Sequence, residues 1–500
     1  MNIYEAFCQR VDLSAGTVAI VDEKIGASCD YAELKVRVDE LASSLSYLGI
    51  QSGDKVLLFV PMSLELYILL LALFKMGACV VFIDPSQGSD FVNRCAKKIE
   101  PDVFIGVPKA YLFFLSAPYL RQIPRRLCTK KIPFIPSIWQ KTSDNVSHKV
   151  NAIDAALITF TSGSTGEPKA IVRSHQFLLN QYQVLKTHVH LEADKVDLSG
   201  LPVFVLANLF AGVSSVIANT RLSHPKKIDP LMLNNAIVKH NITRVGGSPA
   251  LYERLLLSDM KKLNSLRALY MGGAPVMPKL LARLKKALPM SEQFVIYGSS
   301  EAEPIASYAY STLRPQNLQK MQDGAGLFAG DIVDEIRLEI LDTDAKPCAT
   351  NEIGEITVSG KHVVQSYLDT KDNHNIKIEK DNQVWHRSGD SGYVDEDGAL
   401  WLVGRTSAVI EDKKGVVYPF CVEVAASEIV ENRVALLARA NKRVLFIEGV
   451  NIEGVKNVDI ELLLVEKLAW ALIDEWVFIS KMPLDKRHNA KIDYTLLRKL

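Results

Sequence analysis

Cysteine is scarce in this chain of 500 residues, and its spacing excludes two classes of protein. The seven cysteines are odd in number, and no two of them form a Cys-x-x-Cys pair. We therefore expect neither a disulfide framework nor a zinc site. The cysteines are Cys8, Cys29, Cys79, Cys95, Cys128, Cys348 and Cys421.

An excess of charge of one sign is missing as well. Lys and Arg together number 58, and Asp and Glu number 57, which gives a formal net charge of +1. Such a chain has no overall electrostatic attraction to nucleic acid, so we expect no nucleic-acid partner. The densest basic stretch, residues 121–131, is interpreted as a solvated loop.

Long apolar runs are also absent. The longest, Leu66 to Phe74, falls well short of the roughly 20 residues that cross a bilayer, so it predicts a buried helix and no membrane span. The first residues carry charges where a signal peptide would need an apolar segment. We therefore expect a cytoplasmic protein.

The chain does contain a repeated alternation of short β-branched runs with helical stretches, as between Lys55 and Asp84. Its length exceeds what one hydrophobic core supports, which predicts at least two domains. The predicted fold class is α/β. It comprises a large layered N-terminal α/β domain over residues 1–404 and a small mobile α+β C-terminal domain over residues 405–500.

Two further predictions concern the second half of the chain. From about Gly326 the sequence becomes a series of short strands separated by turns, which predicts a β-rich subdomain within the large domain. In the C-terminal domain we predict strands between Val434 and Gly449, followed by a helix from Ile460 to Trp476.

The segment from Leu157 to His175, LITFTSGSTGEPKAIVRSH, leads from an apolar strand into small and hydroxylated residues. Glycine N–H groups, hydroxyl donors and one lysine can converge on an anion, which predicts a triphosphate cradle. Pro168 excludes a Walker loop, which requires Gly-Lys-Ser/Thr. A flexible linker is disfavoured because apolar runs flank the segment on both sides. The candidates are Thr161, Ser162, Gly163, Ser164, Thr165, Gly166 and Lys169.

Two later segments carry residue types that suit a nucleotide. GGAPV follows an apolar strand, so its small residues allow a flat ligand to approach the backbone. YGSSEAEP then supplies an aromatic face, a hydroxyl and a carboxylate. Taken alone, Tyr297 is better explained as a core aromatic and Glu301 as a surface carboxylate. Their spacing after GGAPV favours nucleotide binding. The candidates are Gly272, Gly273, Ala274, Tyr297, Gly298, Ser300 and Glu301.

The TSGSTGEPKA segment resembles the signature loop of the adenylate-forming superfamily, which includes acyl-CoA synthetases, luciferases and peptide-synthetase adenylation domains. Matching motifs follow in the family's order, from about residue 55 to the end of the chain. The resemblance implies an enzyme that uses ATP and Mg²⁺ to convert a carboxylic acid into acyl-AMP and pyrophosphate.

The same resemblance implies roles for single residues. Tyr297 would stack on adenine, and Ser300 would meet the α-phosphate. Glu301 would hold Mg²⁺, a cation that favours carboxylate and phosphate oxygens. In the segment HRSGDSGYVDEDGALWLVGR, Asp390 would accept the ribose hydroxyls and Arg405 would bridge ribose and phosphate.

Catalysis is assigned by the resemblance to two lysines. Lys169 would act from the phosphate loop, and Lys491 would reach the reacting carboxylate and α-phosphate as negative charge shifts. Because Lys491 lies in the C-terminal domain, the resemblance also implies rotation of that domain about a hinge at Ser407.

Several positions depart from the common pattern of the superfamily. Ser407 replaces an acidic or lysine hinge residue, Glu411 replaces a lysine, and Val205 replaces a histidine near the acyl pocket. These departures resemble the olefin β-lactone synthetase branch. That resemblance is carried by DLSGLPVFVL at residues 197–206, GRTS at 404–407 and RHNAKI at 487–492. That branch activates a 2-alkyl-3-hydroxy acid and closes it to a β-lactone. His175 is either a base for this step or a histidine satisfied by its neighbours.

Two other interpretations stay open. The first is an acyl-CoA synthetase or fatty-acyl-AMP ligase, which differs only in what attacks the adenylate. The second is a scaffold of the same fold without catalysis, which is disfavoured because it would need none of the residues assigned to catalysis and nucleotide binding. The expected partner is a small-molecule carboxylic acid, with a partner enzyme or acyl-carrier protein of a biosynthetic pathway as a further candidate.

Overall fold

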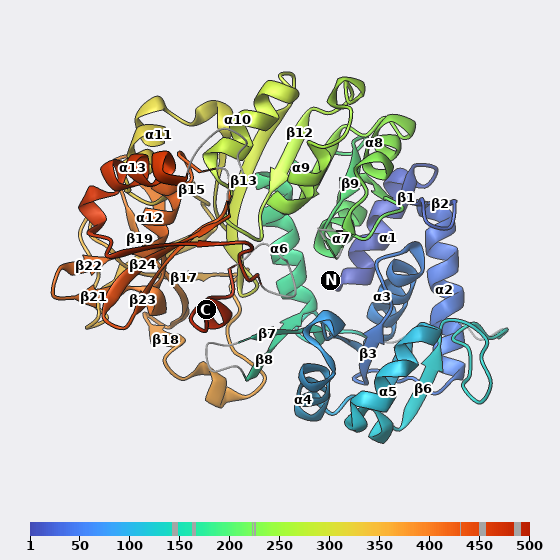
Figure 1. The fold of residues 1–500 in the computed structure, drawn as a ribbon. Coiled ribbons are helices and arrows are strands. Elements are labelled where there is room, and N and C mark those ends of the chain that lie inside the picture. The colour runs from blue at the N-terminus through green and yellow to red at the C-terminus, as the bar shows by residue number, and fades with distance from the viewer. Residues whose placement is uncertain are drawn as a thin grey trace. The chain divides into compact units, whose positions relative to one another are not determined.

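The computed structural model describes residues 1–142, 149–162, 167–222, 224, 227–430, 432–449, 457–484 and 492–500. The chain forms two compact units, each coloured by residue number in Figure 1. Unit 1 comprises Met1–Ser223, Lys227–Gly246 and Lys361–Lys377. Unit 2 comprises His224–Lys226, Gly247–Gly360 and Ile378–Leu500.

Unit 1 contains a six-stranded sheet in the order β6-β5-β3-β4-β7-β8. Its strands are parallel except for the β7–β8 pair, which is antiparallel. A parallel sheet needs crossover helices, and this arrangement confirms the predicted βαβ alternation. The strands are β3 (Lys55–Phe59), β4 (Cys79–Phe82), β5 (Val103–Gly106), β6 (Arg125–Cys128), β7 (Ala155–Ser162) and β8 (Pro168–Ser174).

The crossover from β3 to β4 is helix α3 (Leu64–Met76). The Ser63 side chain caps it by accepting a hydrogen bond from the amide of Leu66 at 3.3 Å. Gly77, at φ 73°, ends it in the left-handed conformation that glycine adopts without strain. Every residue from Leu66 to Phe74 is buried, which confirms the predicted buried helix.

A second sheet of unit 1 has the order β11-β9-β10-β1-β2, parallel except for the β1–β2 pair. Its strands are β1 (Val18–Asp22), β2 (Ala27–Asp30), β9 (Val196–Ser199), β10 (Ser214–Ile217) and β11 (Arg244–Gly247). The remaining α-helices of the unit are α1 (Ile3–Ser14), α2 (Tyr31–Tyr47), α4 (Ser89–Ile99), α5 (Phe113–Ser116), α6 (His175–His188), α7 (Pro202–Ala211) and α8 (Pro230–Lys239).

Unit 2 begins with strands in the order β12-β13-β14-β15-β20-β19-β17-β16, in which only the β12–β13 pair is parallel. This largely antiparallel array contains the strands predicted from about Gly326 onward. The strands are β12 (Ala268–Met271), β13 (Glu292–Ser299), β14 (Ala302–Ala309), β15 (Leu327–Ile332), β16 (Ile336–Leu341), β17 (Gly354–Gly360), β19 (Gln383–Val394) and β20 (Ala399–Arg405), with β18 (Lys377–Lys380) beside β19. The helices are α9 (Pro249–Leu255), α10 (Pro278–Ala287) and α11 (Pro315–Gln322).

The chain after Arg405 forms a hairpin and a three-stranded sheet in the order β23-β24-β25. Both faces of that sheet are covered, because Leu436 and Leu445 belong to one buried cluster and Leu437 and Val444 to another. The elements are β21 (Ile410–Asp412), β22 (Gly415–Val417), α12 (Pro419–Ala426), β23 (Val434–Arg439), β24 (Lys442–Glu448), α13 (Asn457–Lys467), β25 (Glu475–Ile479) and α14 (Tyr494–Leu497).

The helix predicted from Ile460 to Trp476 is wrong in its second half. Helix α13 ends at Lys467, and Leu472 takes a left-handed conformation at φ 50° that reverses the chain. The next residues form β25, which pairs in parallel with β24. Backbone pairing with β24 therefore overrides the local helical pattern.

The mixed α/β class is confirmed, whereas a separate domain from residue 405 onward stays a prediction. In the structure the residues after Arg405 form hydrophobic clusters of their own. They also make an ion pair and a hydrogen bond with earlier residues of unit 2. The Lys467 ammonium lies 3.1 Å from the Asp323 carboxylate, and the Gln322 amide donates to Glu428 at 3.2 Å. All seven cysteines are free thiols.

Candidate active site

The GGAPV segment begins where strand β12 ends, at the carboxyl edge that β12 shares with its parallel neighbour β13. A Cβ atom on Gly272 would lie 3.0 Å from the carbonyl oxygen of Ile296, so this position requires a very small residue. Gly273 is exposed, with φ 75°, and Ala274 is half-buried. The turn is therefore thin and open, as the sequence predicts for the approach of a flat ligand.

The next predicted residues lie where β13 turns into β14. Gly298 is fixed by its surroundings, because a Cβ atom there would lie 2.9 Å from the carbonyl oxygen of Ala302. Ser300 is exposed at the turn, and Glu301, 9% exposed, donates its backbone amide to Ser299 at 3.3 Å. These residues share the carboxyl edge of the parallel pair, the usual place for ligands in open α/β sheets.

Tyr297, Asp390 and Arg405 meet in one polar cluster within unit 2. The Tyr297 hydroxyl donates to Oδ2 of Asp390 at 2.8 Å, and Nε of Arg405 lies 3.1 Å from Oδ1. The Asp390 side chain is 20% exposed and the Arg405 side chain 57% exposed. A carboxylate has about four acceptor sites, so Asp390 keeps capacity for further donors.

Burial raises the pKa of the Tyr297 phenol well above its ordinary value, and the neighbouring Asp390 carboxylate raises it further. Tyr297 is therefore a neutral hydrogen-bond donor throughout the physiological range.

The described residues of the predicted phosphate loop lie in unit 1. Thr161 and Lys169 are direct partners across the antiparallel β7–β8 pair, and Ser162 pairs with Pro168 at its end. The Lys169 ammonium lies 5.6 Å from the centre of the Tyr367 ring, within cation–π range. Gly163, Ser164, Thr165 and Gly166 lie outside the described residues.

Lys491 also lies outside the described residues, but the chain on either side of its segment is anchored. Leu484 and Ile492 form an antiparallel bridge, and the Tyr494 hydroxyl donates to Glu423 at 2.7 Å. Burial raises the pKa of the Glu423 carboxyl to about 7. Ser407 is exposed within a short 3-10 turn directly after β20.

His175 is a core residue in this structure. It is fully buried, its Nδ1 accepts the amide of Ile3 at 3.5 Å, and its ring meets the edge of Phe74. Burial lowers the pKa of His175 to about 4, which makes it a weak base. Burial therefore favours a role in the core over a catalytic one. The histidine is satisfied only at Nδ1, because its Nε2 has no hydrogen-bond partner among the described residues.

Two residues close to the polar cluster were not assigned a role from the sequence. Glu355 of β17 accepts the amide of Gly389 at 3.1 Å, and Ser388 accepts the amide of Asp390 at 3.0 Å. Ser388 lies within the segment HRSGDSGYVDEDGALWLVGR, whereas the sequence around Glu355 was not assigned to any motif. Its contact depends on how β17 pairs with β19.

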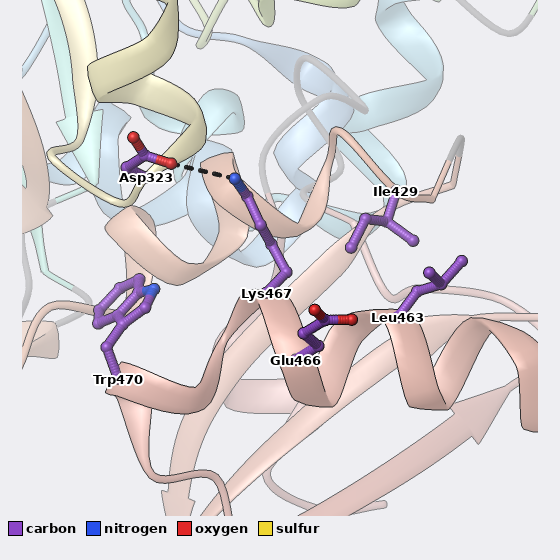
Figure 2. A pocket seen from close by; sticks show the side chains of 6 residues that line it. All are labelled: Asp323, Ile429, Leu463, Glu466, Lys467 and Trp470. Atoms are coloured by element: carbon purple, nitrogen blue, oxygen red, sulfur yellow. Dashed lines mark hydrogen bonds and ion pairs between the residues drawn. The ribbon is translucent and has the colours of Figure 1, made fainter.

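A separate pocket of about 440 Å³ lies in unit 2 (Figure 2). The Lys467–Asp323 ion pair crosses it, and Trp470 stands at one side. None of its lining residues is a predicted site residue; they are Asp323, Ile429, Leu463, Glu466, Lys467 and Trp470.

The described residues contain neither a cluster of metal-ligating side chains nor a helix that could span a membrane. No group of three or more His, Cys, Asp or Glu side chains is arranged there to hold a metal ion. No helix in those residues is both long and apolar enough to cross a membrane.

Comparison with known proteins gives concordant results. The family model described as AMP-binding enzyme matches residues 7–368. The chain is 32% identical to an olefin β-lactone synthetase from Stenotrophomonas maltophilia (strain K279a), over 93% of this chain and 89% of that protein. It is also 32% identical to an olefin β-lactone synthetase from Xanthomonas campestris pv. campestris, over 92% and 89%.

The fold matches solved structures along its whole length. An amide bond synthetase from Marinactinospora thermotolerans superposes with a TM-score of 0.83 at 19% identity, covering 99% of each chain. At that identity the match supports the fold alone, and the family rests on the sequence comparisons. This chain belongs to the AMP-binding enzyme family and is an adenylate-forming ligase that uses ATP.

Proposed function

We propose that this ligase activates a 2-alkyl-3-hydroxy acid as acyl-AMP and then closes it to a β-lactone. The observation that carries the proposal is the similarity, over almost the whole chain, to two olefin β-lactone synthetases. The departures at Ser407 and Glu411 agree with it, because they weaken the expectation of a coenzyme A half-reaction, and Val205 departs from the common pattern near the acyl pocket.

In the first step, a carboxylate oxygen of the acid attacks the α-phosphorus of ATP. The bond from that phosphorus to the bridging oxygen breaks, and pyrophosphate leaves with the electron pair. Lys169, the hydroxyls of its loop and Lys491 would stabilise the negative charge that shifts between these oxygens. Ser300 would hold the α-phosphate.

The polar cluster of unit 2 would hold the nucleoside. Tyr297 would offer its ring face to adenine, Asp390 would accept the ribose hydroxyls, and Arg405 would reach from ribose to phosphate. Glu301 suits Mg²⁺, which proteins commonly bind through one or two carboxylates while substrate phosphates complete the shell. When bound, Mg²⁺ would neutralise charge on the phosphate oxygens.

In the second step, the 3-hydroxyl oxygen attacks the acyl carbon, and the hydroxyl proton passes to solvent water. The bond from that carbon to the AMP oxygen breaks, so AMP leaves and a four-membered ring remains. The hydroxyl and the carbonyl belong to one molecule, so the attack gains the high effective molarity of an intramolecular reaction. We also propose that the chain after Arg405 turns about Ser407 between the two steps.

The product test separates this proposal from thioester formation. Purified enzyme with ATP, Mg²⁺ and a 2-alkyl-3-hydroxy acid is expected to give β-lactone, AMP and pyrophosphate in equal amounts, measured by mass spectrometry. Coenzyme A should change neither the yield nor the product, because no external thiol is consumed.

The matched substrate is the same acid without its 3-hydroxyl. It lacks the internal nucleophile, so the reaction should stop at enzyme-bound acyl-AMP even when coenzyme A is present. Stoichiometric acyl-CoA from the deoxy acid, with no lactone from the hydroxy acid, would replace our proposal with an acyl-CoA synthetase.

The ribose assignment has its own prediction. We expect Asp390→Ala to weaken ATP binding by about 1.5–3 kcal/mol, the usual value of a hydrogen bond to a charged group. Calorimetric titration of the folded variant with ATP measures the change. Unchanged affinity would remove Asp390 from the nucleotide site.

A further inference from the structure

Strands β17 and β19 pair with a break in register at the place where Asp390 lies. Glu355 is opposite Ser391 and Thr357 is opposite Arg387, so two steps along β17 correspond to four steps along β19. Residues 388–390 stand opposite Ile356 alone, so this stretch of β19 carries two extra residues and bulges out of the β17–β19 ladder. Bulges of this kind leave backbone groups without their strand partners and re-aim side chains beside active sites.

Side chains replace the hydrogen bonds that this bulge loses. Oε1 of Glu355 accepts the amide of Gly389 at 3.1 Å, and Oε2 accepts Nε of Arg387 at 2.7 Å. The Glu355 side chain is 10% exposed, so its charge is held in a largely water-free position. Charge-assisted bonds of this kind are roughly twice as strong as neutral ones.

The serine within the bulge completes the arrangement. The Ser388 hydroxyl donates to the carbonyl oxygen of Ile356 at 2.8 Å and accepts the amide of Asp390 at 3.0 Å. Gly389 takes φ 73°, a conformation that suits glycine and turns the chain sharply. The backbone that leads into Asp390 is thus held from β17.

We propose that Glu355 is a positioning residue for nucleotide recognition, which sets the direction in which Asp390 presents its carboxylate. This inference rests on the proposed function, in which Asp390 accepts the ribose hydroxyls. Glu355 bonds to the backbone of the bulge, whereas Asp390 would accept the hydrogen bonds of the ribose hydroxyls. Loss of Glu355 therefore affects discrimination of the ribose more than general affinity for the triphosphate.

Calorimetric titration with ATP and with 2′,3′-dideoxy-ATP, both with Mg²⁺, isolates that effect. Hydrogen bonds to a charged acceptor imply that the wild-type protein prefers ATP by about tenfold or more. We expect Glu355→Ala to reduce this preference to within about threefold, because the bulge loses its anchors. Glu355→Gln should fall between the two, since its amide oxygen can still accept from Gly389.

The matched control is Glu339→Gln on the adjacent strand β16, where the Glu339 carboxylate lies 2.7 Å from the Lys380 ammonium. It should keep the wild-type preference. Asp390→Ala is the reference variant and should lose it. If Asp390→Ala lost the preference while both Glu355 variants kept it, Glu355 would be structural only and the inference would be overturned. If Asp390→Ala kept it, the ribose assignment itself would fail, and the inference with it.

Discussion

Replacing Lys491 by alanine is expected to slow acyl-AMP formation about 100- to 1,000-fold, the usual effect of deleting one electrostatic stabiliser of a transition state. ATP affinity should change much less, because the lysine charge matters most when negative charge moves between the carboxylate and the α-phosphate. Single-turnover measurement of acyl-AMP, with nucleotide affinity measured separately by calorimetry, distinguishes the two effects.

The same segment offers a matched control. Lys499 is an exposed lysine at the end of the chain, so Lys499→Ala removes an equal charge without the proposed role. It should form acyl-AMP at the wild-type rate. Equal rates in both variants would make Lys491 a surface charge, and the source of catalysis would have to be sought in Lys169.

The sequence predicts well those features that a short window of residues determines. Helix α3 is an example, because a serine cap, an unbroken apolar run and a terminal glycine all lie within fifteen residues. The GGAPV turn is another, since an apolar strand followed by glycines places it at a sheet edge. Tyr297, Asp390 and Arg405 do meet in one cluster, although they are far apart in the sequence.

Features that depend on distant strand pairing were not predicted. The residues of β25 alternate between two cores, with Trp476 and Phe478 facing one and Val477 and Ile479 facing the other. That period of two has meaning only once β24 is in place beside them. Glu355 was not predicted for the same reason. Its hydrogen bond with the Gly389 amide depends on the shift in register between β17 and β19.

Two catalytic assignments stay predictions. Lys491 and residues 163–166 lie outside the described residues, so their roles rest on the resemblance of their motifs. Lys169 is described, but its contact with Tyr367 places it only within unit 1.

Asp197 shows how a residue that marks a branch of the family can serve the fold. It begins the segment that resembles the β-lactone synthetase branch, and it is 1% exposed. Its Oδ1 lies 3.2 Å from Nε of Arg244, and its Oδ2 accepts the Asn208 amide at 2.8 Å. Arg244 also donates to the carbonyl oxygens of Val189 and His190, at 3.0 and 2.7 Å. One buried ion pair therefore ties β9 to β11 and to the end of α6.

Arg244→Met is accordingly expected to lower the free energy of unfolding by about 3–5 kcal/mol, because it leaves a buried carboxylate without its counter-charge. Urea unfolding followed by tryptophan fluorescence and circular dichroism measures the loss. The control is Arg283→Met, which removes an exposed partner of Glu253 and should cost at most about 1 kcal/mol. The double variant Asp197→Asn with Arg244→Met should lose less than the sum of its single changes, because the remaining amide carries no charge to compensate. Equal losses for Arg244→Met and Arg283→Met would mean that the pair contributes no more than a surface contact, and Asp197 would then need a role in the reaction to explain its place in the motif.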